Sequence, residues 1–246
     1  MKNNTKMKCP VGTSHLPPLI NDVITDSKCY IDNIFADTWK KLKINSLIKA
    51  AGFSKRSGIE ITESVFLLLL WKWLNTSSIA MFSKKSLGTF SNARKDVMYD
   101  LLKREEINWR KLNTQTAKAV YQQNKLHRSR VKAFVLDDSI KIRKGKKMEG
   151  VSSHFDHVTG RHVMGQQVLT LGLATEEAFL PVDSQIYISN VKEQALIRPH
   201  KEGRSITSKR YTEATTQTKP EMSASMMRRA IRSGVGADYL LGTCMK

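Results

Sequence analysis

The strongest constraint on the fold is a short apolar segment, residues 131–136, that leads directly into two acidic residues, Asp137 and Asp138. Its Val, Ala, Phe and Leu side chains are typical of a strand buried at the centre of a sheet. A carboxylate at the end of such a strand must be solvated, and a divalent cation does this well. Side chains alternate along a strand, so the two acids point to opposite faces and one alone can contact the cation. The spacing leaves open which one it is, and a simple turn is the ordinary alternative for an Asp pair.

More β-rich stretches follow this segment. Residues 162–173 and 179–188 are separated by turn residues and predict, with residues 131–136, an antiparallel meander. Residues 221–233 have a helical pattern that ends at a glycine, and residues 237–241 are again strand-like. The order strand, strand, strand, helix, strand is the beginning of an RNase H-like core. We expect strand 131–136 to be central, with strand 237–241 parallel beside it.

The first half of the chain is mainly helical. Helical patterns cover residues 36–51, 62–74, 93–103 and 109–126, and Thr62 is a candidate N-cap. The expected fold class is therefore α+β or α/β, with a helical N-terminal region followed by a partial RNase H-like mixed sheet.

The charge balance indicates a polyanionic partner. The chain has 41 Lys and Arg against 22 Asp and Glu, a formal net charge of +19. An excess of this size favours nucleic acid, with an anionic membrane surface as the weaker alternative. The longest apolar run, residues 65–71, is far too short to span a membrane, so no transmembrane segment is expected, and DNA rather than a membrane is the expected partner. The three cysteines form no C-x-x-C unit, which argues against a zinc ribbon or a disulfide scaffold and fits a cytoplasmic location.

A basic cluster follows the two acids at once. It consists of Lys141, Arg143, Lys144, Lys146 and Lys147. A solvated basic turn is the plain interpretation, but its position beside the acids favours a group that holds DNA phosphates.

Four other polar residues are interpreted as structural. His154, Asp156 and His157 suggest a metal site, but a polar strand end explains them better because such a site needs further ligands in a fixed geometry. Asp183 has no obvious partner and is expected on a strand surface.

Three blocks of sequence resemble bacterial insertion-sequence transposases with a DDE catalytic domain. The first joins residues 95–102 to Ile107-Asn-Trp-Arg110 and is similar to a helical segment before the catalytic domain. The second begins at Val135-Leu-Asp-Asp-Ser139 and continues, in the family's order, through Lys146-Lys147, Phe155-Asp-His157, residues 168–172 and residues 179–182. The third, residues 236–241, is similar to the strand that normally ends in an acid.

The resemblance implies roles for particular residues. It assigns the first catalytic Asp to Asp138, with Asp137 as its neighbour, and places the second acid at Thr243, which is not acidic here. The third acid, a Glu, is absent. The resemblance also implies Mg²⁺ held by Asp138, double-stranded DNA at transposon ends as partner, and allows a homodimer.

From this resemblance we expect a C-terminally truncated transposase fragment that binds DNA and is inactive alone. The expected domains are a flexible arm at 1–30, a helical DNA-binding or dimerisation region at 31–127, and an incomplete DDE domain at 128–246 with a polar loop at about 190–220. Two alternatives stay open: a truncated DNA-binding regulator of transposition, and a generic basic nucleic-acid-binding protein.

Overall fold

The computed structural model divides into two compact units, and the boundary in the chain falls between Arg104 and Glu105. It describes residues 35, 37–55, 57–74, 78–143, 148–156, 159–189 and 200–242. The expected arm at 1–30 therefore lies outside the described residues. We expected the helical region to extend to residue 127, but helix α7 (Trp109–Gln123) packs on strand β4 and helix α9 of the second unit. The division consequently lies before α7.

The first unit is helical. Its elements are α2 (Ile44–Ala50), α3 (Ile61–Trp73), α4 (Ile79–Phe82), the π-helical turn η2 (Ser83–Leu87), α5 (Gly88–Phe90) and α6 (Asp96–Lys103). Helix α3 is buried on most of its sides, because apolar residues cover nearly its whole circumference. The predicted N-cap Thr62 is wrong: Glu60 occupies that position and Thr62 is buried inside α3. The predicted helix 36–51 is interrupted at Lys43, whose φ of 52° is left-handed.

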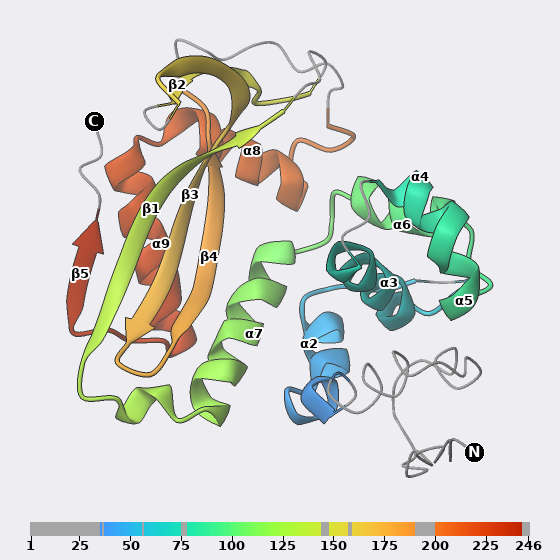
Figure 1. Cartoon of the computed structure of the whole chain (residues 1–246), viewed down its shortest axis with the longest axis horizontal. Coiled ribbons are helices and arrows are strands. Elements are labelled where there is room, and N and C mark those ends of the chain that lie inside the picture. Colours follow the sequence, from blue (N-terminus) through green and yellow to red (C-terminus); the bar gives the residue numbers. More distant parts are fainter. Residues whose placement is uncertain are drawn as a thin grey trace, which may run out of the picture. The chain divides into compact units, whose positions relative to one another are not determined.

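The second unit contains a five-stranded sheet. Its strands are β1 (Lys132–Ile142), β2 (Ser152–Asp156), β3 (Arg161–Thr175), β4 (Phe179–Tyr187) and β5 (Tyr239–Gly242). Strand β3 pairs antiparallel with β1 on one side, and with both β2 and β4 on the other. Strand β1 lies between β3 and β5 and is parallel to β5, as Figure 1 shows. The predicted central strand and its parallel neighbour are confirmed, and the fold is RNase H-like.

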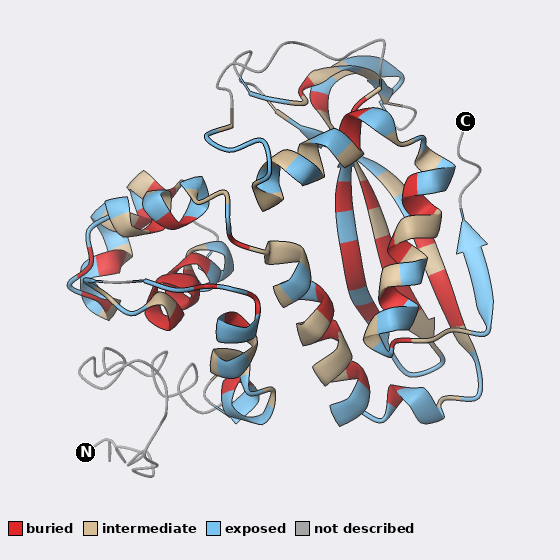
Figure 2. Ribbon diagram, turned by 180° about the vertical axis from the view of Figure 1, so that it is seen from behind, coloured by how far each residue is buried: buried red, intermediate tan, exposed pale blue. Residues whose placement is uncertain are grey.

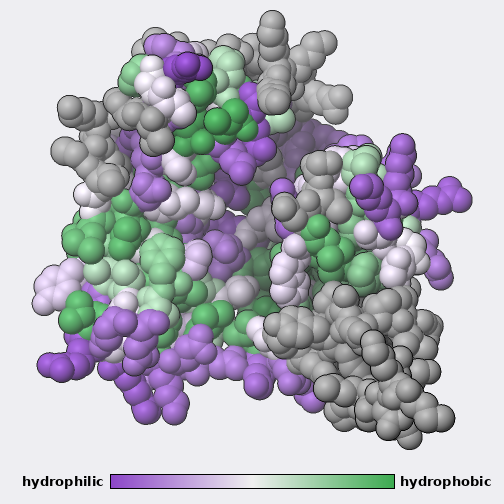
Figure 3. Space-filling model, viewed as in Figure 1, coloured by the Kyte–Doolittle hydropathy of each residue, from purple (hydrophilic) through white to green (hydrophobic). Residues whose placement is uncertain are grey.

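Strand β5 is placed at the edge of the sheet by a few polar contacts. The backbone N–H of Asp238 donates to the carbonyl of Lys132 at 2.8 Å, and the Lys132 ammonium lies 3.0 Å from the Asp238 carboxylate. Tyr239, Leu240 and Leu241 are exposed, and Figure 3 shows hydrophobic surface along this side of the unit.

Helices α7 and α9 (Lys219–Ser233) pack on the same face of the sheet, which we call the covered face (Figure 2). Phe134 and Leu136 of β1 point into it, and so do Leu169, Leu171 and Leu173 of β3. Met222, Met226 and Ala230 of α9 close the core over them. Each fully buried large side chain contributes roughly 1.5–3 kcal/mol, so this layer holds the unit together.

Helix α9 is well delimited at both ends. Thr218 caps it in a capping box with Glu221, and Gly234 ends it with a φ of 93°. The predicted helix 221–233 and its terminal glycine are therefore confirmed, with a start two residues earlier.

The predicted polar loop at 190–220 needs a correction. Residues 190–199 lie outside the described residues, but residues 206–216 form helix α8 (Ile206–Thr216). The Ser205 side chain caps α8 by accepting from the N–H of Ser208. Because α8 is polar over most of its surface and buries Ala214 and Thr215, it lacks the apolar periodicity that predicts a helix.

Strand β1 is also longer than predicted. It continues past the acids to Ile142, with Asp137 and Asp138 paired against Thr170 and Leu169 of β3. The acids thus lie within a strand and not at its end, because β3 extends far enough to pair with them.

Candidate functional site

The two adjacent acids lie on opposite faces of the sheet. Asp138 follows Phe134 and Leu136 on the covered face, and its side chain is 17% exposed. Asp137 is exposed and points to the other face. The alternation resolves the question that the sequence left open: Asp138 is the acid that enters the interior of the unit.

The two carboxylate oxygens of Asp138 differ in their contacts. Its Oδ2 accepts from the Lys219 ammonium at 2.6 Å and from the amide of Gln167 at 2.8 Å. Its Oδ1 is buried and has no hydrogen-bond partner in the described part of the chain. A buried oxygen without a partner is costly, so Oδ1 is an available ligand atom.

A divalent ion fits this position only in part. Mg²⁺ and related ions prefer several oxygen ligands, usually including more than one carboxylate. Asp138 Oδ1 offers one such oxygen, but no group of three or more metal-ligating side chains occurs among the described residues. Thr243, where the resemblance places the second acid, lies outside them.

The two described residues of the basic cluster, Lys141 and Arg143, do not lie beside the Asp138 carboxylate. Lys141 is exposed and, by alternation along β1, lies on the face of Asp137. The Arg143 guanidinium donates from Nε to the Gln166 side chain at 3.1 Å. Lys144, Lys146 and Lys147 lie outside the described residues. The cation beside Asp138 is instead Lys219 from the start of α9, which sequence adjacency could not reveal.

His154 and Asp156 lie on β2. The His154 ring contacts the Ser152 hydroxyl at 2.8 Å, and Asp156 accepts from the Thr159 hydroxyl at 2.8 Å. His157 lies outside the described residues.

Asp183 corrects the sequence-based interpretation most clearly. We expected it on a strand surface, but its side chain is 1% exposed. A register shift between β3 and β4 near Gly172 lets Val182 and Asp183 both turn inward. The Asp183 Oδ2 accepts from Arg229 Nε at 3.0 Å and from a terminal nitrogen of the same guanidinium at 2.7 Å.

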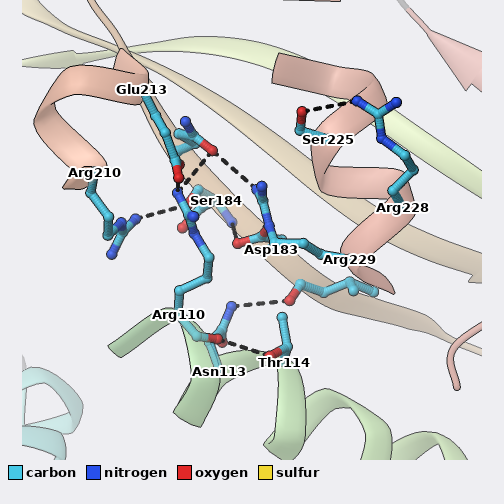
Figure 4. A network of polar contacts seen from close by, with 12 residues as sticks. Arg110, Asn113, Thr114, Asp183, Ser184, Arg210, Glu213, Ser225, Arg228 and Arg229 are labelled. Carbon is cyan, nitrogen blue, oxygen red and sulfur yellow. Dashed lines mark hydrogen bonds and ion pairs between the residues drawn. The ribbon is translucent and has the colours of Figure 1, made fainter. Parts of the chain in front are cut away.

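A wider polar network surrounds Asp183, as Figure 4 shows. The Gln185 side-chain oxygen accepts from Arg110 at 3.1 Å and from Arg229 at 3.0 Å. Arg110 also pairs with Glu213 of α8 at 2.7 Å. These contacts fasten α7, α8 and α9 to β4.

Arg210 adds a third guanidinium to this network. It donates to the Ser184 carbonyl at 3.4 Å. Burial lowers the pKa of the Arg210 guanidinium, and the positive charge of Arg110 lowers it further. Three guanidiniums thus surround the two carboxylates of Asp183 and Glu213, so positive charge is in slight excess here.

The network and Asp138 belong to one region of the covered face. Leu169 pairs with Asp138 on one side and with Gln185 on the other. Two strand spacings, about 10 Å, therefore separate Asp138 from Gln185 in the sheet. Carboxylate, amide and cationic groups gather where the apolar core ends.

The comparison with protein families gives one match. Residues 79–242 match the family model described as DDE superfamily endonuclease, which covers more than half of the chain. No curated protein and no solved structure matches. In the described residues no helix has the length and hydrophobicity to cross a membrane.

Proposed function

The chain belongs to the DDE superfamily endonucleases, and on this premise we propose that it is an insertion-sequence transposase-type protein that binds duplex DNA at transposon ends. The observation that carries the proposal is the position of Asp138. It lies on the central strand of an RNase H-like sheet, points into the covered face, and keeps one buried carboxylate oxygen available. Such an oxygen suits a divalent metal ion at a phosphodiester.

Divalent metal ions are the general cofactor of DDE superfamily endonucleases, and Mg²⁺ is the ion proposed here. Asp138 would hold it through Oδ1, while Asp137 points to the other face and acts at most indirectly. The ion would supply charge stabilisation at the phosphate.

The chain alone is proposed to bind DNA without cutting it. Among the described residues, Asp138 belongs to no group of three or more side chains that could hold a metal ion. Its negative charge is balanced by the ammonium of Lys219. A two-metal reaction needs more carboxylate oxygens than this.

DNA contact is assigned to the basic cluster after the acids. The net charge of +19 supplies the general attraction, and Lys141 is exposed near the end of β1. Lys144, Lys146 and Lys147 continue the cluster in the sequence. A homodimer and a cytoplasmic location complete the proposal.

The salt dependence of DNA binding tests this assignment. Charge reversal at Lys144, Lys146 and Lys147 should reduce the slope of log affinity against log salt by about 2–3, since each neutralised phosphate contributes about 0.9. The measurement is a fluorescence titration with a labelled duplex at several salt concentrations.

A matched control is available at the other end of β1. Lys125, Arg128 and Arg130 are exposed and precede the strand, whose 11 residues span about 35 Å. Their reversal should change the slope much less. Equal slopes for the Lys144, Lys146 and Lys147 variant and the unmodified chain would show that these three residues do not contact phosphate.

A regulator of transposition is the second candidate. The Lys219–Asp138 pair favours it, because a carboxylate already neutralised does not need a metal ion. A regulator should bind terminal inverted repeats more tightly than random duplexes. Similar affinity for every polyanion would instead indicate a generic basic nucleic-acid-binding protein.

A further inference from the structure

The ion pair between Lys219 and Asp138 differs from an ordinary surface contact. The Lys219 side chain is 15% exposed and that of Asp138 is 17% exposed, at a separation of 2.6 Å. The pair connects the centre of β1 to the start of α9 across 81 positions of sequence. Exposed pairs contribute little to stability, whereas breaking a largely buried pair leaves an uncompensated charge.

Lys219 lies at an unusual place for a cation. It is the first residue of α9, where the helix dipole is positive and favours acidic side chains. The capping box of Thr218 and Glu221 fixes the backbone there, and the Lys219 ammonium lies 5.5 Å from the centre of the Tyr187 ring. The carboxylate of Asp138 and the face of this ring together offset the unfavourable dipole.

The contacts of Asp138 bear directly on metal binding. Lys219 and Gln167 occupy Oδ2, while Oδ1 stays available. A divalent ion in contact with this carboxylate would lie within a few ångströms of the ammonium, and like charges at that distance repel strongly. The Lys219 ammonium and a divalent ion would therefore compete for the Asp138 carboxylate.

We propose that Lys219 is the internal counter-cation of Asp138, and that a divalent ion binds this carboxylate only by displacing the Lys219 ammonium. The metal-free unit is then stabilised by its own lysine. This inference rests on the proposed function, because it takes Asp138 to be the metal-binding carboxylate.

The test uses the full chain, manganese chloride as probe and thermal unfolding as readout, with no DNA present. Lys219→Met keeps an unbranched side chain of similar length and removes its charge. It should lower Tm by roughly 5 °C, because Asp138 is left buried without a partner. Mn²⁺ at millimolar concentration should raise the Tm of this variant by about 3 °C or more, while it moves that of the unmodified chain by less than about 1 °C.

Two further variants isolate the pair. Lys219→Met combined with Asp138→Asn removes both charges, and its Tm should exceed that of Lys219→Met and be insensitive to Mn²⁺. Lys209→Met, at an exposed position of α8, should behave as the unmodified chain in both respects.

Two results would overturn the proposal. One is a Lys219→Met chain that responds to Mn²⁺ no more than the unmodified chain does. The other is a double variant no more stable than Lys219→Met. Neither depends on DNA, so a failure of the salt titration would count against the proposed function while leaving this result intact.

Discussion

Single residues on the covered face show how much of this unit depends on paired charges. Asp183 is almost fully buried, accepts two hydrogen bonds from Arg229, and accepts a third at Oδ1 from the N–H of Ser184 at 2.8 Å. Its charge also offsets that of Arg210 nearby. Removing it leaves several guanidiniums facing one another in a region that water reaches poorly.

Asp183→Asn should therefore destabilise the chain by roughly 2–4 kcal/mol, because an uncompensated buried cation costs more than a lost hydrogen bond. Urea unfolding followed by circular dichroism measures this. Asp137→Asn is the matched control, since Asp137 is exposed, and its effect should stay within about 0.5 kcal/mol. Equal midpoints for the two variants would show that the Asp183 network contributes nothing to stability.

At the scale of elements, α3 combines an apolar surface with one buried acid. Glu63 is 7% exposed, and its carboxylate accepts from the Ser91 hydroxyl at 2.9 Å. Burial raises the pKa of Glu63 above its usual 4.5, while the Ser91 hydrogen bond opposes the change. The folded state then binds more protons than the unfolded state, so this group makes stability fall as pH rises from 4.5 through the raised pKa.

Glu63→Gln should remove this penalty. The variant should be more stable than the unmodified chain at pH 7, since the amide stays neutral and can still accept from Ser91. The two should converge below pH 4.5, where the carboxyl is protonated in both states. Urea unfolding across this pH range is the measurement, and a variant less stable at pH 7 would contradict the assigned cause.

The same elements show what the sequence could and could not predict. The strand at 131–136 and its parallel neighbour were predictable, because short runs rich in apolar, β-branched and aromatic residues are typical of strands. Helix α9 was predictable from its periodicity and Gly234. Helix α8 was not, because it is polar and buries few residues.

The candidate site was likewise predictable from the sequence only in part. Alternation along β1 predicted that Asp137 and Asp138 face opposite sides, and the structure adds which of them enters the covered face. Lys219 and Arg229, which pair with Asp138 and Asp183, could not be predicted, because they come from α9, far away in sequence. Nor does local sequence reveal the register shift that turns Asp183 inward.

At the scale of the whole molecule, the chain combines a large positive charge with a carboxylate, Asp138, that belongs to no group of three metal-ligating side chains among the described residues. The charge of +19 favours DNA in general, while Asp138 and Lys219 neutralise each other on the covered face. The proposal therefore separates two properties of the chain: attachment to DNA and metal-dependent cleavage.

Nicking of supercoiled transposon-end DNA tests this separation most directly. The purified chain and its Asp138→Asn variant are incubated with the DNA and Mg²⁺ or Mn²⁺, and a mobility shift on the same samples reports binding. The account predicts a shifted band and intact supercoiled DNA for both proteins at every metal concentration. Metal-dependent nicking by the unmodified chain that disappears in the Asp138→Asn variant would contradict it, because such cleavage requires a complete carboxylate site.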